Sequence, residues 1–223
     1  MVPVLNDEPA LMRLLDALGR EAFDCVVVDG GSGDNSVDIA SRAGACVLQR
    51  DASRGAQLDD GWRAGRGEWC WFLHADSGVS AEVLATVARV SRGQPAWGRF
   101  DVAIAAPPSF APPRFGWQRM VAFMMNLRSA VTGICTGDQG ILVHRTLLEK
   151  VGGVPRQPLM EDIELSRRLR RESAPLRWRT RLATDARRWE RHGVVRTILS
   201  MWRFRLRYFL GAEPERLARE YYG

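Results

Sequence analysis

The stretch Cys25-Val-Val-Val-Asp-Gly-Gly-Ser-Gly-Asp-Asn-Ser36 decides the interpretation of this chain, because a short apolar run ends at an acid and then opens into glycines. The valines are apolar at every position, as in a central parallel strand that is buried on both faces. Ser36–Ala43 follows with helical spacing, and Asn35 or Ser36 is suited to cap that helix. We therefore predict a strand over Cys25–Val28, a tight turn and a helix.

The same alternation continues along the chain. The other predicted strands are Cys46–Gln49, Trp69–Leu73, Trp97–Ile104 and Ile141–Val143, and the other predicted helices are Gln57–Ala64, Ala81–Val90, Phe115–Val131, Arg145–Val151, Asp162–Arg171 and Val194–Leu210. The segment 105–114 contains four prolines and is predicted to be a loop. Strands that alternate with helices indicate an α/β fold with a mostly parallel sheet covered on both faces. The absence of a linker or repeat favours one domain over residues 1–223.

Composition narrows the choice of partners and compartment. The chain has 223 residues with 32 Lys and Arg against 26 Asp and Glu, a formal net charge of +6 that favours an anionic partner. Only Lys150 is a lysine; arginine suits phosphate contacts, although a GC-rich genome would give the same bias. The widely spaced cysteines Cys25, Cys46, Cys70 and Cys135 indicate neither zinc nor disulfides, and three of them lie in predicted strands, where we expect burial. With no signal peptide and no apolar run long enough to span a membrane, we expect a cytoplasmic protein.

The glycine turn resembles a dinucleotide-binding fingerprint but departs from it. Gly31 and Gly33 match the first two glycines, whereas Ser36 stands where the third should be. The acid lies at the end of the strand, as Asp29, where a carboxylate repels phosphate but accepts hydrogen bonds from a base or a sugar. We interpret Asp29 as a nucleoside-recognition residue; the alternative is a loop with a helix-capping aspartate.

A second strand also ends in polar residues, in Trp71-Phe-Leu-His-Ala-Asp-Ser77. His74 and Asp76 are two residues apart on an extended chain and therefore share a face. Mg²⁺ or Mn²⁺ takes carboxylate oxygens and bridges diphosphates, so the pair is a candidate metal site. The alternative is that Asp76 caps the following helix.

Three further motifs supply polar groups in the second half. Thr136-Gly-Asp-Gln-Gly140 places the polar residues Asp138 and Gln139 between Gly137 and Gly140, two glycines that would let the backbone approach a ligand. Met160-Glu-Asp-Ile-Glu164 opens a helix with acids, which the helix dipole alone would favour, but Asp162 is also a candidate general base. Arg187-Arg-Trp-Glu-Arg-His192 gathers cations suited to a diphosphate.

Taken in order, these motifs make the chain similar to the family 2 glycosyltransferases. Val2-Pro-Val-Leu-Asn-Asp-Glu8 looks like their opening motif, VVVDGGSGD carries their base-contacting aspartate, HAD stands in place of their D-x-D, and Glu161-Asp162 matches their catalytic pair. FLHADS, TGDQGILV, MEDIELSRRL, RRWERHG and YFLGAEPERLAREYY resemble a bacterial subgroup named rSAM/selenodomain-associated transferase 2, also labelled arsenosugar-biosynthesis glycosyltransferases. His74 replaces the first acid of D-x-D. Only Met1–Leu5 precede Asn6, so we expect a short first strand or a start that lies upstream.

The resemblance implies a GT-A fold, Rossmann-like with a mixed, mostly parallel sheet, that ends in a helical tail. It implies a nucleotide-binding half over residues 1–104, an acceptor-binding half over 105–192 and amphipathic helices over 193–223. The implied reaction is an inverting transfer from a nucleotide-diphosphate sugar, assisted by Mg²⁺ or Mn²⁺. The residues implied are Pro3, Asn6, Glu8, Asp29, Gly31 and Ser32 for the nucleotide, Asp76 with His74 or His192 for the metal, Asp162 as base, and Gly137, Asp138, Gln139, Glu161, Arg188 and Trp189 around the acceptor or diphosphate.

Other functions remain open at this stage. A nucleotidyltransferase of similar architecture would also place acids at strand ends and would release pyrophosphate. A non-catalytic nucleotide-binding protein would use the same turn, while a nicotinamide-dependent oxidoreductase would need the missing glycine. The acids at the strand ends argue against a nucleic-acid partner. The arginine- and aromatic-rich segment 194–210 would either lie on the inner face of an anionic membrane, reaching a lipid-linked acceptor, or cover the core of the domain.

Overall fold

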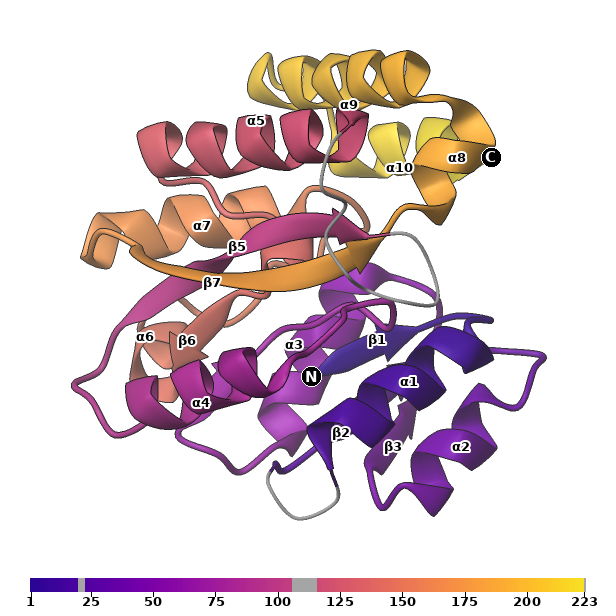
Figure 1. Cartoon of the computed structure of the whole chain (residues 1–223), viewed down its shortest axis with the longest axis vertical. Coiled ribbons are helices and arrows are strands. Elements are labelled where there is room, and N and C mark those ends of the chain that lie inside the picture. Colours follow the sequence, from indigo (N-terminus) through magenta and orange to yellow (C-terminus); the bar gives the residue numbers. More distant parts are fainter. Residues whose placement is uncertain (20–22, 106–115, 223) are drawn as a thin grey trace.

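The structure of the chain is a computed structural model that describes residues 1–19, 23–105 and 116–222, with the side chains of Arg188, Arg191 and His192 left outside the description. One sheet has the order β1-β2-β3 and is parallel, and a second has the order β4-β6-β5-β7 (Figure 1). The strands are β1 Val2–Val4, β2 Val26–Asp29, β3 Cys46–Gln49, β4 Trp69–Trp71, β5 Trp97–Ala105, β6 Leu142–His144 and β7 Leu176–Asp185.

The two sheets are joined at Met1. The Met1 ammonium donates to the Trp71 carbonyl at 2.8 Å, and the Leu73 amide donates to the Met1 carbonyl at 3.1 Å. In the second sheet β6 runs antiparallel to both β4 and β5, whereas β5 and β7 are parallel. The strand pairs are therefore mixed in direction, parallel in β1–β2, β2–β3 and β5–β7 and antiparallel in the two pairs that β6 forms, which agrees with the predicted mixed, mostly parallel sheet.

Helices cover both faces. They are α1 Glu8–Leu18, α2 Ser36–Arg42, α3 Arg54–Ala64, α4 Ala81–Val90, α5 Trp117–Thr132, α6 Arg145–Lys150, α7 Glu161–Glu172, α8 Arg187–His192, α9 Val194–Phe209 and α10 Pro214–Tyr222, with a 3-10 turn over Gly137–Gln139. Because strand side chains alternate, Trp71 and Leu73 join the cluster that includes α1, while Cys70 and Phe72 join the cluster that includes α3. The helices α5, α9 and α10 lie together at one end of the molecule (Figure 1).

Most predicted elements are confirmed within two or three residues, but the sequence analysis named neither α1 nor β7. The predicted loop 105–114 falls almost entirely outside the described residues. Cys46 corrects the expectation of buried strand cysteines, because its side chain is exposed although it begins β3. The reason is that β3 is an edge strand, paired only with β2 in its sheet, and none of its four residues is fully buried.

Candidate active site

Polar residues gather at the carboxyl ends of β1, β2 and β4. Asp29 is the last residue of β2 and its side chain is fully buried. Its Oδ2 accepts hydrogen bonds from the amides of Gly31 at 2.9 Å and Ser32 at 3.0 Å. Its Oδ1 is buried and has no hydrogen-bond partner among the described residues. Since a buried carboxylate oxygen strongly favours a donor, this atom is suited to a group on a ligand.

The turn that follows β1 packs directly against the glycine turn. The Asn6 amide donates to Ser32 Oγ at 2.9 Å, and the Gly33 amide donates to Asn6 Oδ1 at 2.7 Å. Glu8 Oε2 accepts from the side-chain amide of Asn35 at 3.0 Å. The structure therefore brings all six predicted nucleotide-binding residues to one edge, since Pro3 pairs in register with Val28 one residue before Asp29.

The HAD motif lies after β4, facing Asp138 of the 3-10 turn. His74 Nδ1 is 3.4 Å from Asp138 Oδ1 and 3.9 Å from Asp76 Oδ1. Burial, together with the nearby carboxylates of Asp138, Asp185 and Asp7, raises the pKa of Asp76 to about 7, and Arg187 opposes this rise. Several acids thus crowd one poorly solvated place.

This crowding fits a divalent cation. A cation among Asp76, Asp138 and His74 would relieve the repulsion that raises the Asp76 pKa, and hard cations prefer carboxylate oxygens. In the part of the chain that the structure describes, no group of three or more histidine, cysteine or acidic side chains is arranged as a ready metal site. His192, the other predicted ligand, lies outside the described side chains.

Arg54, which the sequence analysis missed, ties this site to the acids of α7. Its Nε is 2.9 Å from Oε1 of the buried Glu161, and its Nη2 hydrogen-bonds His74 Nε2. Burial raises the pKa of Glu161, and the Arg54 charge opposes that rise. The sequence feature that could have identified Arg54 is its place at the start of a helix that follows a strand, on the same sheet edge as Asp29.

Asp162 lies beside the 3-10 turn. Its Oδ2 accepts from the Gly137 amide at 3.0 Å, and its Oδ1 accepts from the Ile163 amide at 2.7 Å. These bonds hold the carboxylate in one orientation. A side chain at position 137 would collide with His74 Nε2 and Arg54 Nη2, which explains the glycine.

Two predicted contacts have packing roles in the structure. Gln139 is fully buried, and its Oε1 accepts from Ser129 Oγ at 2.7 Å. Trp189 is buried in an apolar cluster, with its ring 5.9 Å from that of Trp117. In the same motif Arg187 pairs with Asp7 and Asp185, and Arg188 lies outside the described side chains.

A cleft leads away from Asp162 along α9. A small hollow of about 90 Å³ is lined by His74, Asp138 and Asp162 together with Phe204 and Tyr221. It adjoins a larger hollow of about 1150 Å³ between α9 and α10, because Arg54, Phe204 and Tyr221 line both. We call the two together the α9 cleft. Its inner part is lined by Asp162, so an acceptor that enters it could bring a hydroxyl to that carboxylate.

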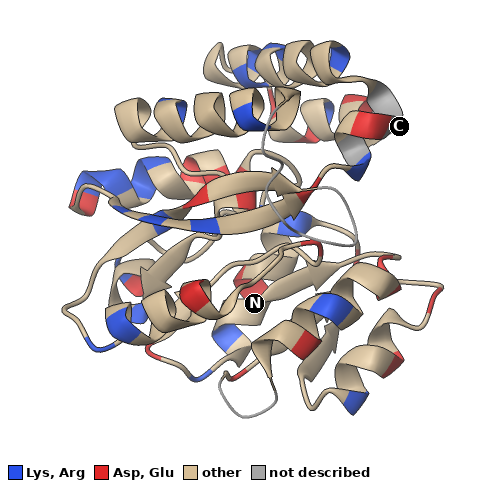
Figure 2. Ribbon diagram, viewed as in Figure 1, with Lys and Arg blue, Asp and Glu red and all other residues tan. Residues whose placement is uncertain are grey.

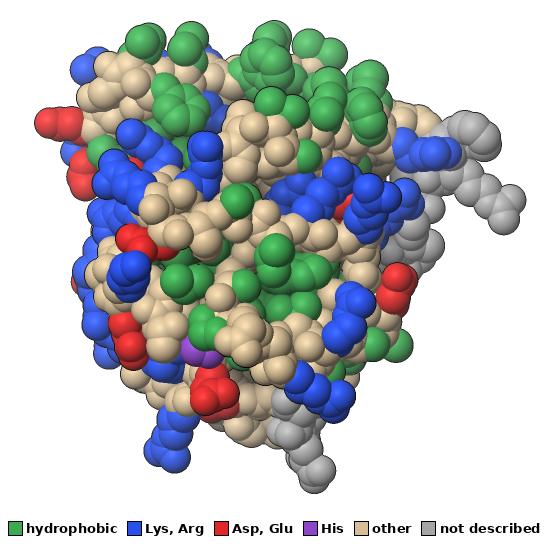
Figure 3. Space-filling view, turned by 90° about the vertical axis from the view of Figure 1, so that its left-hand side faces the viewer, with side chains coloured by type: hydrophobic (Ala, Val, Ile, Leu, Met, Phe, Trp, Pro, Cys, Tyr) green, Lys and Arg blue, Asp and Glu red, His purple; other side chains and the backbone are tan. Residues whose placement is uncertain are grey.

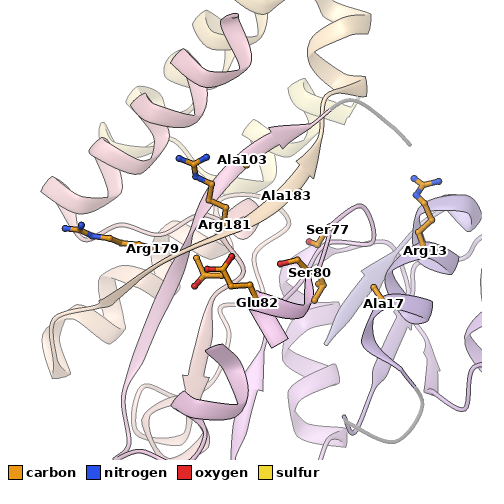
Figure 4. A pocket seen from close by; sticks show the side chains of 12 residues that line it. Arg13, Ala17, Ser77, Ser80, Glu82, Ala103, Arg179, Arg181 and Ala183 are labelled. Atoms are coloured by element: carbon orange, nitrogen blue, oxygen red, sulfur yellow. The ribbon is translucent and has the colours of Figure 1, made fainter. Parts of the chain in front are cut away.

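A separate hollow of about 670 Å³ lies between α1, the start of α4 and β7. Figure 4 shows Arg13 from α1, Glu82 from α4, and Arg179 and Arg181 from β7 around it. None of the predicted site residues lines it. The reactive groups therefore belong to the α9 cleft and the adjoining strand ends.

Comparison with known proteins agrees with this geometry. The family model described as "Glycosyl transferase family 2" matches residues 1–152, which include both strand-end motifs and the 3-10 turn. The chain belongs to this family. The family match ends before Asp162, so α7 and the C-terminal helices lie beyond it.

Curated relatives match only part of this chain. A PGL/p-HBAD biosynthesis glycosyltransferase of Mycobacterium tuberculosis (strain ATCC 25618 / H37Rv) is 33% identical over 99 residues, covering 40% of this chain and 39% of the relative. An undecaprenyl-phosphate 4-deoxy-4-formamido-L-arabinose transferase of Pseudomonas aeruginosa (strain LESB58) is 30% identical over 161 residues, covering 65% of this chain and 45% of the relative. The chain thus spans less than half the length of these relatives.

Solved structures show the same GT-A glycosyltransferase fold. The S. aureus TarS 1-349 structure with UDP has a TM-score of 0.61 and 16% identity over 83% of this chain and 59% of that one. The mannosyltransferase PcManGT from Pyrobaculum calidifontis, in complex with GDP-Man and Mn²⁺, has a TM-score of 0.59 and 19% identity over 82% of this chain and 55% of that one. The predicted fold is confirmed, while the narrower subgroup stays a prediction.

Proposed function

We propose that this chain is an inverting, metal-assisted glycosyltransferase that moves a sugar from a nucleotide-diphosphate sugar to an acceptor hydroxyl. The observation that carries the proposal is the placement of three acids: Asp29 ends β2, Asp76 lies among other carboxylates after β4, and Asp162 accepts from the Gly137 amide of the 3-10 turn. Family membership and the nucleotide-bound neighbours support it.

The nucleoside would bind at the turn between Asn6 and Ser32. The unpartnered Oδ1 of Asp29 would accept a hydrogen bond from the base or ribose, while its Oδ2 keeps the glycine turn closed. One buried carboxylate would thus stabilise the turn with one oxygen and bind the ligand with the other.

The diphosphate would lie between this turn and the HAD motif. Asp76, with Asp138 and His74, would hold Mg²⁺ or Mn²⁺, which when bound supplies positive charge toward the leaving diphosphate. Arg54 is placed by Glu161 and His74 at the same edge and adds a fixed cation. Preorganised charge of this kind stabilises the developing anion without reorganisation.

Asp162 would accept the proton of the acceptor hydroxyl as that oxygen attacks the anomeric carbon. The Gly137 and Ile163 amides orient the carboxylate toward the α9 cleft, where the acceptor would enter. No covalent intermediate is needed, so the bond to the diphosphate breaks as the bond to the acceptor oxygen forms.

The test is Asp162→Asn, which removes the base and keeps an acceptor for one of the two amides, those of Gly137 and Ile163, that the carboxylate oxygens bind. We expect nucleotide binding with Mg²⁺ or Mn²⁺ to survive and transfer to fall about 10²–10⁴-fold. Transfer at the wild-type rate would overturn the assigned base. Release of pyrophosphate in place of nucleoside diphosphate would show a nucleotidyltransferase.

We also propose that the segment 194–210 contacts an anionic membrane at its inner face. No helix of the described residues is long and apolar enough to cross a membrane, so the contact would be peripheral. The alternative is that this segment covers the core of the domain, but α9 buries only part of its apolar surface. Phe204 is buried, whereas Trp202 is 65% exposed.

A further inference from the structure

The outer side of α9 carries an exposed apolar stripe. Its members follow one another at helical spacing of three and four residues and are all more than half exposed: Val195, Leu199, Trp202, Leu206 and Phe209. The opposite side of the helix is what packs on the domain, through residues such as Ile198 and Met201. Exposed large side chains in such a contiguous row mark an interaction surface.

A second stripe of the same kind lies on α5. Met120, Phe123, Met124, Leu127 and Val131 are exposed at helical spacing, with Phe123 at 65% and Val131 at 78%. Buried residues on the other side, such as Val121 and Met125, pack against β5 and α9. The sequence analysis assigned no surface role to this helix.

The two stripes form one continuous surface. Both helices contribute to one apolar cluster, which contains Met125 of α5 and has Ile198 and Met201 of α9 packed against it, and both lie at the same end of the molecule (Figure 1). Figure 3 shows hydrophobic side chains gathered along the end of the molecule where these helices lie. We call the two stripes the α5–α9 surface.

The charges on these helices have a single sign. α5 contains Arg119 and Arg128, α9 contains Arg196, Arg203, Arg205 and Arg207, and neither helix contains Asp or Glu (Figure 2). Arg128 bonds inward to Thr136, Arg205 lines the small hollow at Asp162 and Arg207 pairs with Glu220 of α10, whereas Arg119, Arg196 and Arg203 are exposed. An apolar stripe with exposed arginines beside it complements the boundary between acyl chains and anionic headgroups. We propose that the α5–α9 surface docks the protein on an anionic lipid membrane, with both helices in contact.

A second copy of the chain fits this surface poorly. A two-fold dimer would place the same patch on itself, so the exposed arginines of one protomer would face those of the other, while Glu220 of α10 is already paired with Arg207. A membrane rich in anionic lipid provides the missing negative charge.

The docking surface also opens into the proposed acceptor site. Val195 and Leu199 belong to the stripe and line the outer part of the α9 cleft, while Phe204 and Tyr221 continue the wall to Asp162. A lipid whose polar group enters the cleft would keep its chains at the membrane. Resting on the proposed transferase function, this geometry assigns the acceptor to the class of membrane lipids.

The experiment is vesicle flotation of the full chain with phosphatidylcholine, with and without phosphatidylglycerol. We expect wild-type protein to float with the anionic vesicles and much less with the neutral ones. Phe123→Glu with Leu127→Glu on α5, and separately Trp202→Glu with Leu206→Glu on α9, should each lower the floating fraction several-fold. Met12→Glu is the matched control, because Met12 is 46% exposed on α1, away from this end (Figure 1).

Each outcome decides the proposal. If the variant with Phe123→Glu and Leu127→Glu floats as well as the wild type, α5 does not contact the membrane. If the wild-type protein does not float, the membrane-docking proposal is wrong. A dimer in light scattering that the same variants dissociate would show an interface between copies. Circular dichroism checks folding, and nucleotide binding without vesicles separates failure of docking from failure of the transferase proposal.

Discussion

Gly137 and Asp162, which are 25 residues apart, are joined by a hydrogen bond of 3.0 Å from the Gly137 amide to Asp162 Oδ2. The same glycine leaves room for the ends of His74 and Arg54, which lie against its Cα. One residue thus couples the orientation of the proposed base to the position of the groups around the diphosphate.

Gly137→Ala should therefore damage activity more than stability. The methyl group would meet only the ends of two flexible side chains, so the fold can accommodate it while Arg54 and His74 move. Displacements of about 1 Å at a reacting site cost about 10²-fold in rate. The measurement is nucleoside diphosphate release, with the melting temperature determined in parallel.

Gly67→Ala is the matched control, because the nearest atom to its added methyl group is the Trp69 carbonyl oxygen at 3.4 Å, an ordinary contact. It should leave the release rate unchanged. An active Gly137→Ala variant would show that the positions of Arg54 and His74 are unimportant.

Much of this architecture could be predicted because the hydrophobic pattern of each element, and the acids at the ends of strands, can be recognised from neighbouring residues alone. Val26–Val28 is apolar throughout, and the acid that follows, Asp29, lies at the edge where we propose that the nucleoside binds. By contrast β7 was missed because its outer part is exposed and carries Arg177, Arg179 and Arg181 in alternation, which disguises a strand. Its inner part is buried only because β5 lies beside it.

Long-range contacts explain the rest of what sequence could not predict. Arg54 acquires its importance from Glu161, far along the chain, and no spacing rule connects them. Trp189 looked available for a ligand, but α5 and α9 fold over it. α9 has apolar residues on two sides, so its sequence pattern does not show which side packs on the core. The side that faces outward therefore could not be predicted.

The cysteines should differ sharply in reactivity. Cys46 is exposed, whereas burial raises the pKa of Cys25 and Cys70 and raises that of Cys135 to about 12. Because the thiolate is the nucleophile, iodoacetamide at neutral pH should modify Cys46 first in the folded protein. Mass spectrometry of a time course checks this, and Cys46→Ser should remove the fast phase. Rapid alkylation of Cys135 in folded protein would contradict the structure.

Asp101 should support the fold through two arginines. Arg99 Nη1 donates to its Oδ1 at 2.8 Å, and Arg177 Nη2 donates to its Oδ2 at 2.8 Å. Burial opposes ionisation, but the hydrogen bonds from Arg177 and Arg99 outweigh it and hold the pKa of Asp101 below its usual value. Asp101→Asn leaves the buried Arg99 charge uncompensated, a loss of about 3–5 kcal/mol for a buried pair. Because Arg177 is partly exposed, we expect the loss of stability to lie near the lower end of this range.

The pH dependence follows from the sign of that shift. Since the folded pKa is depressed, the contribution of Asp101 is complete above its unfolded pKa of about 3.9 and is lost as pH falls through the folded value. Urea unfolding should show a large difference between wild type and Asp101→Asn at neutral pH that shrinks toward about pH 3. Asp38→Asn is the control, because Asp38 and Arg42 form an exposed pair at 3.9 Å and should contribute little. A difference that grows in acid would contradict the assignment.

Asp29 allows nucleotide recognition to be separated from the shape of the turn. In Asp29→Asn the amide oxygen can still accept from the Gly31 and Ser32 amides, but the Oδ1 position becomes an NH₂ group that faces a ligand donor. We expect near-native stability with nucleotide affinity lowered by about 1–3 kcal/mol, since a hydrogen bond to a charged acceptor is replaced by a mismatch. Asp29→Ala should lose affinity and stability together, because two turn amides also lose their acceptor. Calorimetric titration with nucleoside diphosphates, beside thermal unfolding of each variant, distinguishes the two effects. If Asp29→Asn binds as tightly as the wild type, Oδ1 does not face the nucleoside, and the carboxylate serves only to close the turn.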